Sequence, residues 1–397
     1  QPRYDLDLSV EKLQVGAFRK LASPPIDELS GLWSYAGKLT LEQTGPAIKL
    51  NHAGKTRIES LLLVLAEAGL ETSIGQFSHD GKLAFEQSGS ELRVDEGGEI
   101  SVEALRLAMR EAGIEASIDQ FSINGDLTFA QTESARELSQ TGKTALGSLR
   151  LVLGEAGVET SVGQFSHDGK LAFAQSGTGL RLDEGGKIAV ETLRLAMREA
   201  GVETSIGQFS HSGELAFEQS GEAVSLQQEG AISLALLDVS LQQPALDVNN
   251  GQLELTTKLN YSNSPAGAEM QLASDIALQD LDIKASEGKV NLVSAETLTI
   301  EELLFQGADQ VSIKAISSEQ IQVGKVSGGE ADEPQSLVRS DKLQIAKLSR
   351  AGNLLAIDSV VYEGFHNRIV RDKDGNLEVM RFIDLIGNLN TPATTAE

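Results

Sequence analysis

The sequence contains no cysteine, which excludes structural disulfides and thiolate metal sites. Aromatic residues make up only 4% of the chain, so Leu, Val, Ile and Ala must fill any interior. The longest apolar run, LLLVLA at 61–66, has the length of a strand and falls far short of the roughly 18 residues of a membrane span. Because the chain begins at Gln1 without a signal-like stretch, we expect a processed piece of a longer protein, with any anchor outside it.

Basic residues are also scarce. The chain has 33 Lys and Arg residues against 58 Asp and Glu residues, which gives a net charge of −25. Phosphate binding needs a surface rich in Lys and Arg, so the composition argues against nucleic acid as a partner. It argues equally against electrostatic docking on anionic lipid, although an acidic surface that keeps the protein soluble explains the charge as well.

The most informative feature is an internal repeat. The segment GQFSHDGKLAFEQSG at 75–89 returns at 163–177 and 207–221 with small changes, and more loosely at 119–133. Residues 70–113 and 158–201 match at 35 of 44 positions. Repeats of this length are typical of stacked units that share one interior. The motif glycines are spaced by 44 residues: Gly37, Gly81, Gly125, Gly169 and Gly213.

Each 44-residue unit is interpreted as four short strands. Turns are predicted at HDG 79–81, GS 89–90 and DEGGE 95–99, because Asp-Gly and Asn-Gly favour hairpins. The segment SVEALRLAMREAG has helix formers, but its equivalent LGSLRLVLGEAG would place Gly147 and Gly154 inside a helix, so a strand is favoured. One strand per 11 residues is typical of an all-β meander. After about residue 222 the sequence of the repeat unit is predicted to diverge, with Gly251 in place of the glycine expected near 257.

Hairpin register indicates which side chains share a face. A three-residue turn at His79-Asp80-Gly81 places Phe77, Leu83 and Phe85 together. Gln76, Lys82 and Glu86 then point the other way. We expect this apolar face, without regular polar groups, to form a lipid-binding groove. Its predicted residues are Trp33, Leu39, Leu41, Phe77, Leu83, Phe85, Phe121, Leu127, Phe129, Phe165, Leu171, Phe173, Phe209, Leu215 and Phe217.

The predicted fold is mainly β: an elongated antiparallel meander curled into a groove, built in part from four-strand repeats, with a short C-terminal helix. Open sheets seldom exceed about 10 strands without curling or splitting, and a large apolar face needs a cover. The predicted divisions are 1–29, an initial strand and connector; 30–229, the repeats; 230–326, a divergent continuation of the sheet; 327–336, an acidic loop or linker; 337–387, strands and a short helix capped by Asn376; and 388–397, a disordered tail.

Two terminal segments carry a family resemblance. They are LAIDSVVYEGFHNRIVRDKDGNLEVMRFIDL near the C-terminus and YDLDLSVEKLQVGAFRKLASPPIDELSGLWSYAGKLTLEQ near the N-terminus. Both resemble the AsmA-like envelope proteins, in which D-L-x-L strands alternate with G-x-L-x-L passages. The resemblance implies a long β-groove and a Gram-negative periplasmic location, with an inner-membrane anchor outside this chain. It also implies similarity to bridge-like lipid-transfer proteins, whose partners are phospholipids or other acyl lipids.

Three patterns suggest chemistry that their context disfavours. Ser78, His79 and Asp80 are adjacent, whereas a catalytic triad converges from separated positions. His79, His167 and His211 could form a metal ladder, but they are predicted in turns, and no carboxylate recurs beside all of them. DKDGN at 372–376 lacks the glycine and glutamate spacing of a calcium loop. The prediction is therefore a protein that is not an enzyme and has no cofactor or metal.

The sequence supports two classes of function. The first is a non-enzymatic groove that holds or conducts lipid in the bacterial envelope. The alternative is a structural repeat protein, such as a stalk, spacer or adhesin, or a scaffold for outer-membrane protein assembly. The two classes differ in the apolar face, which a conduit leaves open and a stalk closes with its own side chains.

Overall fold

The structure is a computed structural model that describes residues 2–21, 26–242, 245–264, 267–285, 290–306, 310–326, 336–352, 354–367 and 379. It is 88% strand and forms one open antiparallel meander of 18 strands that does not close into a barrel. The predicted β-meander fold is therefore confirmed. Among the described residues, no helix is long and apolar enough to cross a membrane.

The strands are much longer than predicted. From the N-terminus they are β1 (Arg3–Gln14), β2 (Glu28–Thr44), β3 (Ala47–Leu65), β4 (Leu70–Ser88), β5 (Glu91–Met109), β6 (Ile114–Gln131), β7 (Ala135–Leu153), β8 (Val158–Ser176) and β9 (Gly179–Met197). They continue as β10 (Val202–Ser220), β11 (Ala223–Gln242), β12 (Ala245–Ser264), β13 (Gly267–Ala285), β14 (Val290–Gln306), β15 (Gln310–Val326), β16 (Val338–Ala351), β17 (Leu354–Glu363) and β18 (His366–Asn367). Short 3₁₀ helices are η1 (Val15–Leu21), η2 (Ala66–Ala68) and η3 (Arg110–Ala112).

Each 44-residue repeat therefore contributes two long strands, and the prediction of four short ones was wrong. The turns predicted at 79–81 and 95–99 lie inside β4 and β5, where Asp80 pairs with Glu99 and Gly81 with Gly98. The turn at 89–90 is confirmed. Asp-Gly is compatible with a hairpin turn, but it can also lie within a continuous strand, as Asp80 and Gly81 do in β4. In β4 the glycine instead serves a close approach between neighbouring strands, described below.

The prediction of a three-residue turn was wrong, but the side chains that it placed on one face do share a face. Phe77, Leu83 and Phe85 lie on one uninterrupted strand and are separated by even numbers of residues, so they share a face. Gln76, Lys82 and Glu86 have the opposite parity. SVEALRLAM belongs to β5, which confirms the strand prediction for that segment.

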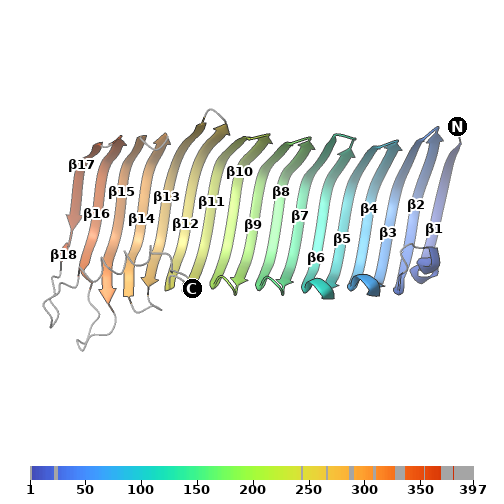
Figure 1. The fold of residues 1–397 in the computed structure, drawn as a ribbon, viewed down its shortest axis with the longest axis horizontal. Coiled ribbons are helices and arrows are strands. Elements are labelled where there is room, and N and C mark those ends of the chain that lie inside the picture. Colours follow the sequence, from blue (N-terminus) through green and yellow to red (C-terminus); the bar gives the residue numbers. More distant parts are fainter. Residues whose placement is uncertain are drawn as a thin grey trace, which may run out of the picture. The chain divides into compact units, whose positions relative to one another are not determined.

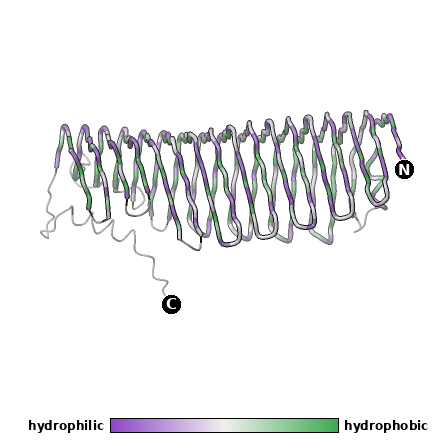
Figure 2. The backbone as a smooth tube through the Cα atoms, turned by 90° about the horizontal axis from the view of Figure 1, so that it is seen from above, coloured by the Kyte–Doolittle hydropathy of each residue, from purple (hydrophilic) through white to green (hydrophobic). Residues whose placement is uncertain are grey.

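By its internal contacts the chain divides into two compact units. The first comprises residues 1–193, 210–229 and 260–268, and the second comprises 194–209, 230–259 and 269–397. In the first unit, consecutive strands from β1 to β8 are antiparallel neighbours, as Figure 1 shows for β2 to β8. Figure 2 shows hydrophilic and hydrophobic residues alternating along these strands.

The second unit contains a continuation of the repeat. Gly251 does not replace the motif glycine, because it faces Asp280 as Gly207 faces Leu236. The position 44 residues after Gly213 is Thr257, and the position 44 after Gly230 is Ser274. Both are buried, and the hydroxyl of Ser274 donates to the carbonyl oxygen of Thr256 at 3.1 Å. Small hydroxyl residues therefore occupy the glycine positions of the earlier repeats, and the repeat continues further than predicted.

Few apolar side chains are buried. Among the described residues they are Tyr35 in the first unit and Ala285, Leu292, Ala295 and Leu337 in the second. The predicted helix capped by Asn376, the DKDGN segment at 372–376 and the tail 388–397 lie outside the described residues, apart from Val379. The acidic segment 327–335 lies outside them too.

Candidate functional site: a glycine row between two apolar rows

One glycine from each strand forms a continuous row across β2 to β8. The register pairs each with the next, and the row consists of Gly37, Gly54, Gly81, Gly98, Gly125, Gly142 and Gly169. A Cβ atom built on Gly81 would lie 2.3 Å from the carbonyl oxygen of Gly97 and 2.9 Å from the Cα of Gly98. Neighbouring backbones approach so closely here that only glycine fits. The predicted turn glycines thus mark a crease inside the sheet.

A second line of bends runs parallel to the crease. Non-glycine residues with positive φ recur every 44 residues along this line in the first unit: Ser60, Ala104, Ser148 and Thr192. Leu236 and Asp280 continue the same spacing in the second unit, and φ lies between 51° and 57° at all six. Ala104 faces Gly75, whose added Cβ would lie 3.0 Å from that of Ala104. Positive φ is costly for residues other than glycine, so these positions are sites of local backbone strain. The pattern indicates that each repeat bends at two fixed levels.

Two unbroken apolar rows flank the glycine row. The first apolar row, on the side of the second bend, is Trp33, Ile58, Phe77, Val102, Phe121, Leu146 and Phe165. The second apolar row is Leu41, Leu50, Phe85, Val94, Phe129, Leu138 and Phe173. Their side chains are half-buried, except for Leu138, which is 37% exposed. Eight of the predicted groove residues belong to these two rows.

The remaining predicted groove residues are distributed differently. Leu39, Leu83, Leu127 and Leu171 form one row, but they alternate there with His52, Glu96 and Gln140. The expectation of an apolar face without regular polar groups was therefore wrong. Phe209, Leu215 and Phe217 are half-buried in β10, at positions 44 residues beyond Phe165, Leu171 and Phe173.

A series of buried polar side chains occupies the space above the glycine row. Its members are Tyr35, His52, His79, Glu96, Gln140, His167, Glu184, His211 and Gln228, and they are buried or nearly so. Each stands two residues before a row glycine, or before its equivalent in β9 to β11. Because neighbouring strands are antiparallel, successive members stand on opposite sides of the row and lean toward each other over the glycines. The missing Cβ atoms leave the room that the side chains fill.

The contacts of this buried polar series fall into two clusters. In the first, the hydroxyl of Tyr35 lies 2.9 Å from Nδ1 of His52, and the rings of His52 and His79 are 5.3 Å apart. Nε2 of His79 lies 3.1 Å from Oε1 of Glu96. A carboxylate can only accept, so His79 carries its proton on Nε2 in this pair.

In the second cluster one carboxylate lies between two imidazoles. Oε1 of Glu184 is 3.4 Å from Nε2 of His167, and Oε2 is 3.5 Å from Nδ1 of His211. The place that corresponds to His211 beside Glu96 holds Ile123. Oε2 of Glu96 accordingly has no hydrogen-bond partner among the described residues. Ile123 thus separates the two clusters.

Burial shifts the protonation of two members of the first cluster. The pKa of His52 lies below its ordinary value because burial disfavours the imidazolium and the nearby His79 repels it, against a raising effect of a backbone hydrogen bond with Gly54. Burial also raises the pKa of the Tyr35 hydroxyl. The first cluster therefore favours neutral His52 near pH 7.

The predicted catalytic and metal patterns take a definite form in the structure. Ser78 and Asp80 have opposite parity to His79 and point to the other face, so the three do not converge. The histidines lie inside strands, which corrects their placement in turns, and each has a glutamate neighbour. Among the described residues, no group of three His, Cys, Asp or Glu side chains is arranged to hold a metal ion.

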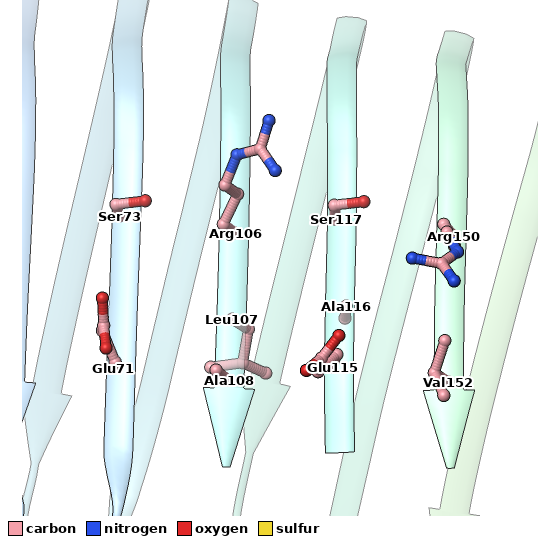
Figure 3. A pocket seen from close by; sticks show the side chains of 10 residues that line it. All are labelled: Glu71, Ser73, Arg106, Leu107, Ala108, Glu115, Ala116, Ser117, Arg150 and Val152. Atoms are coloured by element: carbon pink, nitrogen blue, oxygen red, sulfur yellow. The ribbon is translucent and has the colours of Figure 1, made fainter. Parts of the chain in front are cut away.

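A separate depression of about 250 Å³ lies beyond the second bend (Figure 3). One row of its lining is Ser73, Arg106, Ser117 and Arg150, and the next contains Glu71 and Glu115. Arg150 binds Glu159 at 3.0 Å, and Glu71 accepts from Arg110 at 2.8 Å. The lining contains two arginines and two glutamates, so its positive and negative charges balance. The ion pairs are exposed to solvent and therefore add little electrostatic stabilisation.

Most of the polar series was missed by the sequence analysis. The signal that could have found it is a polar residue two positions before each recurring glycine, as in His-x-Gly at 79–81 and Glu-x-Gly at 96–98. Searches of protein families, curated proteins and solved structures found no match to this chain.

Proposed function

We propose that the protein holds acyl lipids on the apolar face of its open sheet, as a non-enzymatic component of the Gram-negative envelope with a periplasmic location. The observation that supports this most is the pair of unbroken apolar rows on one face of the open sheet. In a closed stalk these side chains would be buried, whereas here they are half-buried. Apolar strips of this extent usually bind a partner.

The rows suit a linear apolar ligand. They run perpendicular to the strands, and neighbouring strands lie about 4.8 Å apart, so each row offers a side chain roughly every 4.8 Å. An acyl chain that lies along a row gains about 0.8 kcal/mol for each methylene group removed from water. The resemblance of the terminal segments to AsmA-like proteins supports the same substrate class.

Extraction of the purified chain tests the proposal. The full chain is purified without detergent and extracted with organic solvent, and the extract is analysed by mass spectrometry. We expect diacyl lipid in near-stoichiometric amount, or loading after incubation with phospholipid vesicles. Recovery of no lipid from either preparation would reject the groove and favour the structural array.

The structural alternative rests on a different observation. The crease is filled by the protein's own buried polar side chains, so part of the face is closed from within. A spacer needs only this internal closure and the repeated geometry. It predicts that the chain purifies free of lipid and that substitutions in the apolar rows affect stability alone.

A further inference from the structure

Four of the five histidines of the chain lie in the crease, and they share two carboxylates. The histidines are His52, His79, His167 and His211, and the carboxylates belong to Glu96 and Glu184. With all four imidazoles neutral, the crease holds the negative charges of the two glutamates alone. Full protonation would place four cations against two anions, with the side chains 9% exposed or less in the His–Glu pairs.

We infer that the buried polar series is a pH-sensitive device and that acidification opens the crease at its β2–β4 end. In the first cluster, Oε1 of Glu96 lies 3.1 Å from Nε2 of His79, and the ring of His79 lies 5.3 Å from that of His52. Protonation of both rings would place two cations beside this one carboxylate. Two imidazolium rings then face each other in a buried space with one carboxylate, which is unfavourable.

Apart from its backbone hydrogen bond with Gly54, His52 has no compensating charge beside it among the described residues. From β2 it faces Tyr35, which is neutral, and from β4 it faces His79. Leu39 and Leu83 are its register partners on the two sides. The charged residues Lys38, Lys55, Asp80 and Lys82 on the three strands have the opposite parity and point to the other face. Glu96 reaches the cluster only through His79.

The direction of the effect follows from linkage. His52 has a lower pKa in the folded chain than in the unfolded chain. At pH values between these two pKa values, the unfolded chain therefore binds more protons than the folded chain. Stability from neutral His52 is thus fully present above the ordinary histidine value of about 6.5 and is lost as pH falls through the lower folded value. The expected event is separation of Tyr35, His52 and His79 over the glycine row, which widens the crease. This inference does not rest on lipid binding.

Trp33 supplies a local reporter because it is the single tryptophan and its ring lies 6.1 Å from that of Tyr35. The experiment follows the emission maximum of Trp33 in the full chain from about pH 8 to about pH 5. The test variant is His52→Gln, since glutamine occupies the equivalent positions 140 and 228 of this chain. The control variant is His366→Gln, which removes an exposed histidine outside the crease.

We expect a red shift on acidification in the parent and in His366→Gln, and its loss in His52→Gln. An unshifted parent, or a His52→Gln variant that shifts like the parent, would overturn the inference. If His52→Gln does not fold, imidazole titration of the parent by NMR decides. His52 must then titrate below the ordinary histidine value of about 6.5, and a midpoint at or above that value rejects the device.

Discussion

Nε2 of His79 lies 3.1 Å from Oε1 of Glu96, although the two residues occupy different register levels on neighbouring strands. They meet because Gly81 and Gly98, which lie between them, have no side chains. A backbone feature thus creates a buried polar contact. The same arrangement recurs 88 residues later between His167 and Glu184 at 3.4 Å.

The glycine row is expected to be intolerant of any side chain. In Gly81→Ala the new Cβ would lie 2.3 Å from a backbone oxygen, so β4 and β5 would have to separate. We expect the free energy of unfolding to fall by about 2–4 kcal/mol. Gly147→Ala in β7 is the matched control, because its Cβ would meet only Gln120 at 3.7 Å. That variant should be unchanged or more stable by up to about 1 kcal/mol. Urea denaturation compares them, and equal losses would contradict a close approach specific to the row.

At the second bend, a change to glycine is expected to be tolerated, whereas in the glycine row a change from glycine is expected to destabilise the fold. Ala104 has φ of 52°, so Ala104→Gly relieves strain while adding freedom to the unfolded chain, and we expect little change or a small gain in stability. Ala104→Val places a β-branched residue in the left-handed region and should cost about 1–2 kcal/mol. Thermal denaturation measures both. Ala108→Val, on the same strand with ordinary backbone geometry, serves as the reference. A valine at 104 as stable as one at 108 would show that the bend carries no strain.

The carboxylate of Asp95, on the face of β5 opposite the apolar rows, gives the stability a pH dependence of known sign. The pKa of Asp95 is lowered by the hydrogen bond from Arg93, with a further bond from Thr128, against burial, which raises it. The stability that this carboxylate contributes is present above its ordinary value of about 3.9 and is lost as pH falls through the lowered value. Arg93→Met should raise the NMR titration midpoint of Asp95. Arg181→Met, which removes the equivalent arginine beside Asp183, is the control and should leave the midpoint of Asp95 unchanged. A midpoint unmoved by Arg93→Met would refute the assignment.

A charge on the second apolar row should prevent lipid loading. Phe85→Asp places a carboxylate between Leu50 and Val94, and its desolvation should reduce bound lipid by at least about tenfold. Lys82→Asp introduces the same side chain on the opposite face of β4 and should leave loading unchanged. Lipid per chain is measured by mass spectrometry on variants shown to be folded by circular dichroism. A folded Phe85→Asp variant that carries lipid as well as the parent would exclude the second apolar row as the binding surface.

The sequence by itself determined the fold class, the repeat length and the residues that share the apolar face. These follow from local physics: alternation with period two specifies a strand, and an even spacing between Phe77, Leu83 and Phe85 keeps them on one side. The 44-residue recurrence also required equivalent segments to have one structure. That requirement correctly assigned SVEALRLAM to a strand despite its helix-forming residues.

Only the tertiary structure decided what the recurring glycines do. A glycine after Asp or Asn is compatible with a turn and with a close approach between strands, and the local sequence is the same in both cases. Gly81 pairs with Gly98 on one side and with Gly54 on the other. This pairing selects the close approach between strands, because three neighbouring backbones then meet without side chains. The position of His79 follows from this. It is a turn residue if the chain reverses at Gly81, and a buried partner of Glu96 if the strand continues.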